Sequence, residues 1–409
     1  MQVYLDLLEN ILREGEYVTH TRTKKEVYRI IGPQIEFWTD PFFPLVTTRQ
    51  INFKNVITEL DWFLSGQTNN ISLVKKNNHI WDKWGLSIED VYSCNGRDKY
   101  GNSLSIGDCG PIYGAQWIRW KTTDGRYINQ IQELIRSLRE DPYSRRHIVS
   151  AWNPEFLPDE NISPQLNVIQ GKQSLAPCHT LFQVFVQHAP LWARINDAGE
   201  DFYRELLHRS DVMMHFHKHL CHVLEKSKIR WIKDFFNKDY YWEIIPSLFK
   251  KRVFNPDVFK EVNDTLPDRR VLHSEVINHG HILDHLPEGM ESFTPPKKDM
   301  IHLKMYARSQ DVPLGTVFNV ASYSLLIHLL AAHLNMLPGR YIHTMGDAHI
   351  YGEQAEKVKE QLERKPLERP RLRVFNQNSD EYTSFLMKNK TIRLEGYNSH
   401  PPLTYRIAV

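Results

Sequence analysis

The sequence predicts a mixed α/β (α+β) protein that carries a large helical insertion. A chain of 409 residues, 41% hydrophobic and 24% charged, has enough length and apolar content for one large or two ordinary domains with a buried core. Segments with helical spacing of apolar residues are interspersed with segments rich in β-branched and aromatic residues. Between residues 188 and 299 the composition changes to Lys- and aromatic-rich helical sequence, followed by a stretch rich in Pro and His.

The first half of the chain is expected to begin with two amphipathic helices. MQVYLDLLENILREGE places its apolar residues on one helical face, and it carries Asp6 and Glu9 where a signal peptide would have no charge. NVITELDWFLSG has helical spacing, contains Glu59 and ends at Gly66, a common residue after a helix end. The polar, Gly-rich segment 85–110 is expected to be a surface loop.

A third helix is expected at INQIQELIRSLRED, followed by strands at HIVSAWN and HTLFQVFV, with Cys178 at the start of the second strand. After residue 299, IHLKMYARS predicts a strand and ASYSLLIHLLAAHLN a long helix. The apolar segment beginning at Ser324 is interrupted by His328 and His333 and is too short to cross a bilayer. We therefore predict no membrane partner.

Charge and cysteine content restrict the partners and the compartment. The 51 Lys and Arg residues nearly balance 49 Asp and Glu residues, so the chain lacks the basic character of proteins that wrap nucleic acid. The four cysteines include no C-x-x-C pair, and nothing indicates an oxidising compartment. We expect reduced thiols, a cytoplasmic location and no nucleic-acid partner.

A few polar residues could carry chemistry. Cys178, in A-P-C-H, is either a small buried apolar residue or a nucleophile, which would need nearby positive charge to form a thiolate. Arg145, Arg146 and Arg308 have hydroxyl-bearing neighbours and suit phosphate binding, or they belong to solvated faces. Glu59, in an apolar helix, is either a carboxylate at the edge of the core or an acid/base group with a raised pKa.

One His-rich segment resembles a zinc site only superficially. The cluster is His215, His217, His219, Cys221 and His222. In a helix, His215 and His219 would share a face while His217 would not, and no fourth ligand follows at standard spacing. We predict no bound metal. The glycine-rich and G-x-S-x-G fingerprints of common nucleotide-binding proteins and hydrolases are also missing from the sequence.

Taken together, segments spread over residues 1–187 and 300–409 resemble the thymidylate synthase family. They are PLVTT, ELDWFLSGQTN, IWDKW, GPIYGAQW, DPYSRRHIVSAWNP, LAPCH, ARSQDVPLGTVFNVASYSLL, HTMGDAHIY and EGYNSHPP. The resemblance implies a bent mixed sheet flanked by helices, formed by 1–187 with 300–409, and an inserted lobe at 188–299. It also implies a homodimer in which Arg145 and Arg146 serve the phosphate bound by the partner.

The implied reaction transfers a one-carbon unit from 5,10-methylenetetrahydrofolate, a co-substrate, to C5 of dUMP. Addition of the Cys178 thiolate to C6 would make C5 nucleophilic, and the surrounding arginines would lower the pKa of the thiol. Asn319 stands at the base-pairing position, where relatives acting on cytosine carry Asp, so the resemblance favours dUMP over dCMP. The implied catalytic residues are Cys178, Glu59, Tyr113, Asp311 and Asn319.

The resemblance also assigns binding residues. Those for the nucleotide are Arg22, Arg145, Arg146, Arg308, Ser309, Asn319, His349 and Tyr351. Those for the folate are Arg49, Trp81, Asp311, Leu314, Gly315, Phe318 and Val409, whose carboxylate would close the site as a lid that excludes water.

The product depends on how the exocyclic methylene intermediate is consumed. Hydride from the folate gives thymidylate, whereas water gives 5-hydroxymethyl-dUMP. Three departures favour water: Ala307 stands where synthases carry Gln, Arg22 is followed by TKKEV instead of a glycine-rich loop, and the insertion is long. Bacteriophage deoxyuridylate hydroxymethyltransferases, whose product serves DNA modification, resemble this chain in length.

Two alternatives remain open. Trp81 and the terminal Ala-Val, which shield the intermediate from water in synthases, favour thymidylate synthase proper with dihydrofolate release. A catalytically inactive family member could bind a nucleotide or RNA, but such a protein would have no need of the Cys178 thiol. Substitution of Cys178 by Ala would separate an enzyme from a binding protein.

Overall fold

The computed structural model describes residues 1–19, 24–190, 193–194, 197–198, 296–377 and 381–405. The chain divides into two units, Met1–Val186 with Ile301–Val409, and Gln187–Met300. The first unit contains the candidate site. Most of the predicted inserted lobe at 188–299 lies outside the described residues, as does the His215–His222 segment, so the predicted domain boundaries stay a prediction.

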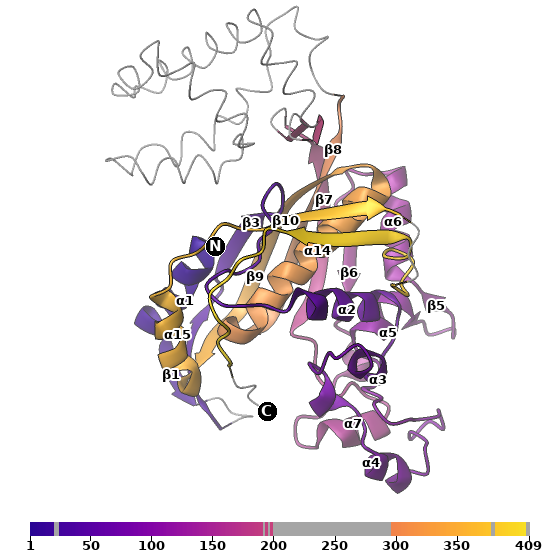
Figure 1. Ribbon diagram of the computed structural model, residues 1–409. Coiled ribbons are helices and arrows are strands. Elements are labelled where there is room, and N and C mark those ends of the chain that lie inside the picture. The colour runs from indigo at the N-terminus through magenta and orange to yellow at the C-terminus, as the bar shows by residue number, and fades with distance from the viewer. Residues whose placement is uncertain (20–23, 191–192, 195–196, 199–295, 378–380, 406–409) are drawn as a thin grey trace, which may run out of the picture. The chain divides into compact units, whose positions relative to one another are not determined.

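A bent sheet of seven strands forms the scaffold of the described part of the first unit, in the order β1-β2-β9-β8-β7-β6, with β3 also paired to β9 (Figure 1). The long strand β9 pairs antiparallel with β3 along its first half and with β2 along its second half. Strands β1/β2 and β6/β7 are also antiparallel. The strands are β1 (Glu16–Thr19), β2 (Glu26–Ile31), β3 (Gln34–Trp38), β6 (Ile148–Ser150), β7 (His179–His188), β8 (Asp299–Asp311) and β9 (Leu337–Tyr351).

The helices pack around this sheet, and two small antiparallel hairpins accompany them (Figure 1). The hairpins are β4 (Trp120–Lys121) with β5 (Tyr127–Ile128), and β10 (Arg371–Asn376) with β11 (Lys390–Glu395). The helices are α1 (Gln2–Glu14), α2 (Phe53–Leu64), α3 (Ile71–Val74), α4 (Ile88–Ser93), α5 (Tyr113–Ile118), α6 (Gln130–Glu140), α7 (Pro164–Ile169), α14 (Val317–Leu334) and α15 (Ala355–Leu362). Short helical turns include η1 (Asp82–Trp84), η2 (Pro154–Phe156), η5 (Val312–Thr316) and η6 (Gly352–Gln354).

Helix α14 is apolar all round, as expected for a helix buried on every side. It ends at Asn335, whose left-handed backbone (φ 55°) is a common helix terminator. Residues Val312–Leu334 form the one helical stretch of the described chain that is long and apolar enough to cross a membrane, and 72% of its most apolar window is buried inside the protein. Such burial is the property of a core helix.

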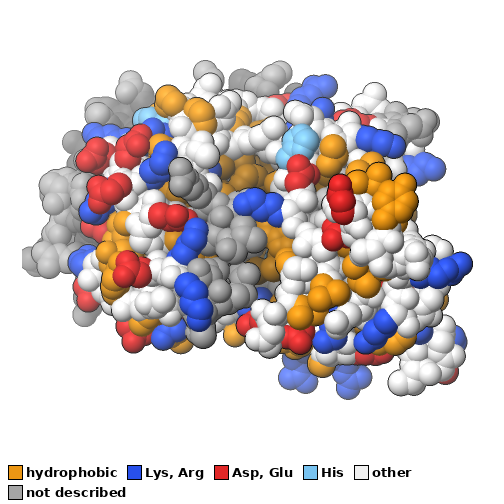
Figure 2. Space-filling model, turned by 90° about the horizontal axis from the view of Figure 1, so that it is seen from below, with side chains coloured by type: hydrophobic (Ala, Val, Ile, Leu, Met, Phe, Trp, Pro, Cys, Tyr) orange, Lys and Arg blue, Asp and Glu red, His pale blue; other side chains and the backbone are white. Residues whose placement is uncertain are grey.

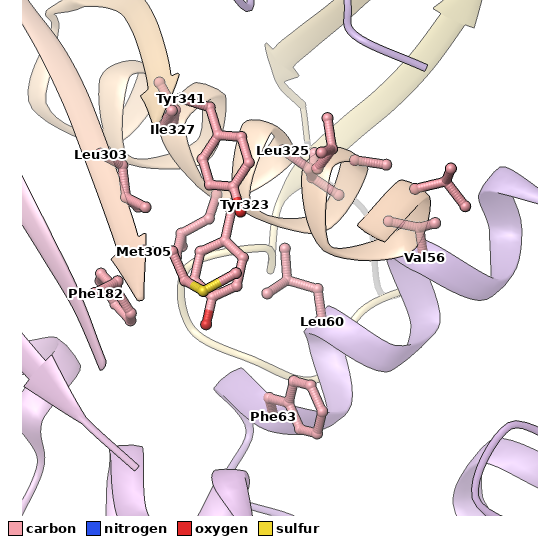
Figure 3. Packing of buried hydrophobic residues seen from close by; sticks show 14 of the residues in the cluster. Val56, Leu60, Phe63, Phe182, Leu303, Met305, Tyr323, Leu325, Ile327 and Tyr341 are labelled. Carbon is pink, nitrogen blue, oxygen red and sulfur yellow. The ribbon is translucent and has the colours of Figure 1, made fainter. Parts of the chain in front are cut away.

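The core lies between α14, α2 and the sheet (Figure 3). Tyr323 of α14 lies parallel to Tyr341 of β9, with ring centroids 5.9 Å apart, and packs edge-on against Phe182 of β7. Leu60 and Phe63 of α2 approach the same cluster (Figure 3). Aromatic pairs of this kind add roughly 0.5–1.5 kcal/mol beyond the burial of their area, so this cluster holds α2 and α14 firmly beneath the site.

The predicted fold class is confirmed, and each predicted helix and strand of the first unit is present. Helix α2 ends as expected, with Gly66 in the left-handed conformation (φ 74°). The segment 85–110 differs in part, because it contains α4, which begins at a capping box between Ser87 and Asp90. The elements not predicted from the sequence include β1–β3, the long strand β9 and the β10/β11 hairpin.

Candidate active site

Cys178 lies directly before β7 and is held from two sides. Its backbone N–H donates a 2.8 Å hydrogen bond to the hydroxyl oxygen of Tyr113, the first residue of α5. Its carbonyl oxygen accepts a 2.8 Å hydrogen bond from the backbone N–H of Arg308 on β8. The side chain of Cys178 is half-buried. The fold thus presents one thiol at a fixed backbone position between α5 and β8.

The guanidinium of Arg308 lies against the loop that leads to the thiol. Its Nε donates to the carbonyl oxygen of Pro177 (2.9 Å), and Nη2 donates to that of Ala176 (3.2 Å). The same group lies 5.7 Å from the ring centre of Trp152. The structure therefore brings Cys178 and Arg308 together and fixes a positive charge beside the cysteine loop. The next predicted residue, Ser309, is partly exposed on β8.

Glu59 of α2 accepts a 2.7 Å hydrogen bond from the indole N–H of Trp81. It keeps some contact with solvent but is densely surrounded by protein atoms. Burial raises the pKa of Glu59 to about 7, although the hydrogen bond from Trp81 acts in the opposite direction. Trp81 itself is buried against Trp62 and Phe63. At neutral pH this carboxyl group can both take up and release a proton.

Two side chains without a predicted role connect Glu59 with the cysteine. The ring of His179 stacks on Tyr113 with centroids 4.0 Å apart, and its Nδ1 is 2.7 Å from the hydroxyl oxygen of Tyr323. Burial lowers the pKa of His179 to about 3, so the imidazole is neutral at physiological pH. Burial and the charge of Glu59 raise the pKa of Tyr323. In the sequence, a role for His179 in the site is indicated only by its position directly after Cys178. For Tyr323 the sequence indicates a place in a helix and no role in the site.

A second group of predicted residues meets at the turn η5, between β8 and α14. Asp311 accepts hydrogen bonds from the backbone N–H of Leu314 (3.1 Å) and from Nε2 of Gln354 (3.0 Å), and burial raises its pKa. Buried Arg49 donates from Nη2 to the carbonyl oxygen of Pro313 (2.7 Å). The guanidinium of Arg49 also lies 5.1 Å from the ring centre of Tyr405. Arg49, Asp311 and Leu314 therefore form one connected unit.

Asn319, in the first turn of α14, is next to this unit. Its Nδ2 donates a 3.0 Å hydrogen bond to Oε1 of Gln310, a buried residue that was not predicted from the sequence. The one sequence feature that could have indicated Gln310 as a site residue is its place in the segment ARSQD, beside Arg308 and Asp311. Leu314, Gly315 and Phe318 are partly exposed on the turn and the start of α14.

The remaining predicted residues occupy the end of β9 and the surface. His349 and Tyr351 are buried with ring centroids 5.1 Å apart, and Nδ1 of His349 is 2.6 Å from Oδ1 of Asp347. Arg145 and Arg146 are exposed between α6 and β6. Arg22 and Val409 lie outside the described residues.

The surface view shows a hollow near the middle of one face, with hydrophobic side chains visible in its depth (Figure 2). Among the residues that the structure describes, no cluster of three or more His, Cys, Asp or Glu side chains is arranged to hold a metal ion. The site combines a thiol, a nearby guanidinium and a carboxyl group that titrates near neutrality, and these groups suit nucleophilic and acid/base catalysis.

Comparison with protein families agrees with this chemistry. Residues 2–215 and 257–409 match the family model described as thymidylate synthase. The match enters the segment 188–299 from both sides and leaves 216–256 without a counterpart in the family model. Members of this family are folate-dependent transferases that act on C5 of a pyrimidine nucleotide, typically dUMP. Because the match covers most of the chain, this protein belongs to the thymidylate synthase family.

Proposed function

We propose that this protein transfers a one-carbon unit from 5,10-methylenetetrahydrofolate to C5 of dUMP and releases 5-hydroxymethyl-dUMP. The observation that carries the proposal is the placement of Cys178 between Tyr113 and Arg308, with Glu59 close enough to act on Tyr323, which contacts His179 next to the cysteine. A family member that only bound nucleotides would gain nothing from a thiol fixed in this way.

In the first step, the Cys178 thiolate forms a bond to C6 of the uracil, and the C5–C6 π electrons move to form an enolate at C4–O4. C5 then attacks the folate methylene carbon, the bond from this carbon to N10 of the folate breaks with the electron pair left on N10, and C5 afterwards loses its proton. The fixed positive charge of Arg308, 2.9 Å and 3.2 Å from two carbonyl oxygens before Cys178, favours the thiolate and a phosphate group on the nucleotide.

Glu59 is proposed to handle protons at O4 and C5. The raised pKa, about 7, lets the carboxyl group release and recapture a proton within one catalytic cycle. Tyr323 and His179 lie between the carboxyl region and the cysteine loop, and both are neutral at physiological pH. Because neither side chain exchanges a proton near neutral pH, neither competes with Glu59 for the proton that it carries.

Loss of tetrahydrofolate from the adduct leaves an exocyclic methylene at C5. In the proposed final step the oxygen of a water molecule bonds to this methylene, one water proton is released, and the Cys178–C6 bond breaks. The support is Ala307, which is fully buried directly before Arg308 and ends in a methyl group. It offers no amide to order the base and its waters in the way a Gln would.

Thymidylate synthase proper is the second candidate. Buried Trp81, packed against Trp62 and Phe63, supplies an apolar wall that would protect the methylene from water until hydride transfer. The two candidates share every step up to the methylene and differ in whether dihydrofolate is formed.

We also propose a homodimer with shared sites, located in the cytoplasm. Ile148, Leu181 and Tyr306 are exposed on three neighbouring strands of the sheet, whereas Phe182, next to Leu181, is buried on the other face. A sheet face with several exposed large apolar residues suits association with a second copy. Arg146 is two residues from Ile148 and would reach the partner's site at the edge of such an interface.

The proposal is tested by incubation of the purified protein with dUMP and 5,10-methylenetetrahydrofolate. A covalent nucleotide adduct on the tryptic peptide that contains Cys178, and a new nucleotide modified at C5, are expected. Absence of both would refute C5 transfer.

A further inference from the structure

The side chain of Gln310 is enclosed at the point where β8 passes through η5 into α14. Gln310 is 3% exposed. Its Nε2 donates to the carbonyl oxygen of Asp311 (3.4 Å), and its Oε1 accepts from Nδ2 of Asn319 (3.0 Å). A Cβ atom added to Gly315 would lie 2.6 Å from the same Nε2, so the turn passes closely over the glutamine amide.

These contacts determine which end of each amide faces which neighbour. A backbone carbonyl only accepts hydrogen bonds, so Nε2 of Gln310 must face Asp311 and Oε1 must face Asn319. Asn319 must then present Nδ2 to Gln310. If the Asn319 amide turned over, its Oδ1 would face Oε1 of Gln310, and two acceptors without a shared proton repel each other.

We propose that Gln310 is a specificity-determining positioning residue, which holds the Asn319 amide in the orientation that binds uracil and rejects cytosine. This inference rests on the proposed function, in which Asn319 contacts the base. With one N–H engaged by Gln310, Asn319 still offers its second N–H to O4 and its Oδ1 to N3–H of uracil. Cytosine presents the opposite pattern, an amino group at C4 and an acceptor at N3, and would need the amide turned over.

The experiment measures the dissociation constants of dUMP and dCMP by calorimetry, with no folate present. Gln310→Met keeps the length of the side chain and removes both polar atoms of the amide. The Kd for dCMP divided by the Kd for dUMP is expected to fall by roughly tenfold or more, which means a weaker preference for dUMP. Gln310→Glu keeps an acceptor facing Asn319, and at this buried position its protonated carboxyl group can donate an O–H to the carbonyl oxygen of Asp311 as Nε2 does. This variant is therefore expected to keep the ratio within about threefold.

A double-mutant cycle separates positioning from general loosening of the site. In an Asn319→Ala background, Gln310→Met should leave the ratio unchanged, because there is no amide left to orient. Gln130→Met is the matched control: it removes a part-buried glutamine that joins α6 to α5 and to β6, and it should cost stability without altering the ratio. If Gln310→Met fails to fold, Gly315→Ala is used instead, since its added Cβ displaces the Gln310 amide.

An unchanged ratio in a folded Gln310→Met or Gly315→Ala protein would overturn the inference, as would an equal effect in the Asn319→Ala background. If the wild-type protein prefers dUMP to dCMP and the variants keep the same ratio of dissociation constants, only the role of Gln310 is refuted and the proposed function stands. If the wild-type protein binds neither nucleotide, the proposed function fails with it.

Discussion

The indole N–H of Trp81 donates a 2.7 Å hydrogen bond to Oε1 of Glu59, and this bond opposes the effect of burial on the same carboxyl group. Burial favours the neutral acid and the hydrogen bond favours the carboxylate. Burial has the larger effect, and the pKa of Glu59 is about 7. One side chain from the predicted folate site thus tunes the proposed proton carrier.

Replacement of Trp81 by Phe should raise the pKa of Glu59 further. Phe keeps much of the packing against Trp62 and Phe63 but offers no N–H donor. The pH dependence of kcat, expected to change near 7 in the wild-type protein, should shift to higher pH in Trp81→Phe. It should disappear in Glu59→Gln. A shift to lower pH in Trp81→Phe would contradict the assigned role of the hydrogen bond.

Glu59 also predicts how stability depends on pH. Its pKa is raised on folding, so the folded state holds the proton more tightly than the unfolded state. The stabilisation from this proton is fully present below about pH 4.5 and is lost as the pH rises to about 7. Glu59→Gln lacks this dependence. Between pH 4.5 and 8, the free energy of unfolding of Glu59→Gln should increase by roughly 2 kcal/mol relative to that of the wild-type protein. This value is smaller than the full pKa shift would give, because Glu59 keeps some contact with solvent. Urea unfolding at the two pH values measures it; a constant difference between the proteins would contradict the raised pKa.

Cys178→Ala should abolish turnover, by at least about 10³-fold, and retain binding of dUMP, because it removes the nucleophile and leaves the backbone contacts to Tyr113 and Arg308. Cys109→Ala is the matched control. Cys109 is buried, burial raises its pKa to about 12, and its thiol donates to the carbonyl oxygen of Gly107. That variant should lose some stability and keep its turnover. Activity surviving in Cys178→Ala would rule out the covalent route.

Ala307→Gln should shift the product toward thymidylate. The added amide would lie next to Arg308 and order the base and its waters as the synthase pattern does. Ala307→Met adds similar bulk without an amide, and it controls for overpacking at this fully buried position. Chromatography of the nucleotide products gives the ratio. An equal shift in both variants would mean that volume, not the amide, decides the product.

Shared sites predict complementation between two inactive proteins. Cys178→Ala supplies the arginines and Arg146→Ala supplies the thiol, so half of the dimers in an equilibrated mixture are hybrids with one complete site each. Activity should recover to about one quarter of the wild-type value. The mixture is unfolded and refolded together, and the separately refolded proteins serve as the control. No recovery would place both groups in the same chain or exclude the dimer.

The sequence predicted those parts of the structure that depend on local patterns. The periodicity of α1, α2, α6 and α14 and the β-branched runs of β6, β7 and β8 were sufficient to place them. Strands β2, β3 and β9 were not predicted, and each depends on a partner far away in the chain, because β2 and β3 pair with the two halves of β9. Such pairing is a long-range contact that a single-sequence pattern does not record.

The candidate site was predicted less from local patterns than from resemblance. Cys178 and Arg308 lie 130 positions apart in the chain, and only the placement of β7 beside β8 brings them together. Gln310 was missed because its role depends on the turn between β8 and α14. That turn folds the glutamine amide back against Asn319, and nothing in its residue type announces this contact.

The most direct test of the account is the mass of the nucleotide formed from dUMP and 5,10-methylenetetrahydrofolate, with absorbance followed for dihydrofolate. We predict a product heavier than thymidylate by one oxygen atom, because a hydroxyl group replaces one hydrogen of the methyl group, and no dihydrofolate. Thymidylate formed together with an equal amount of dihydrofolate would contradict it and identify the reaction as reductive methylation.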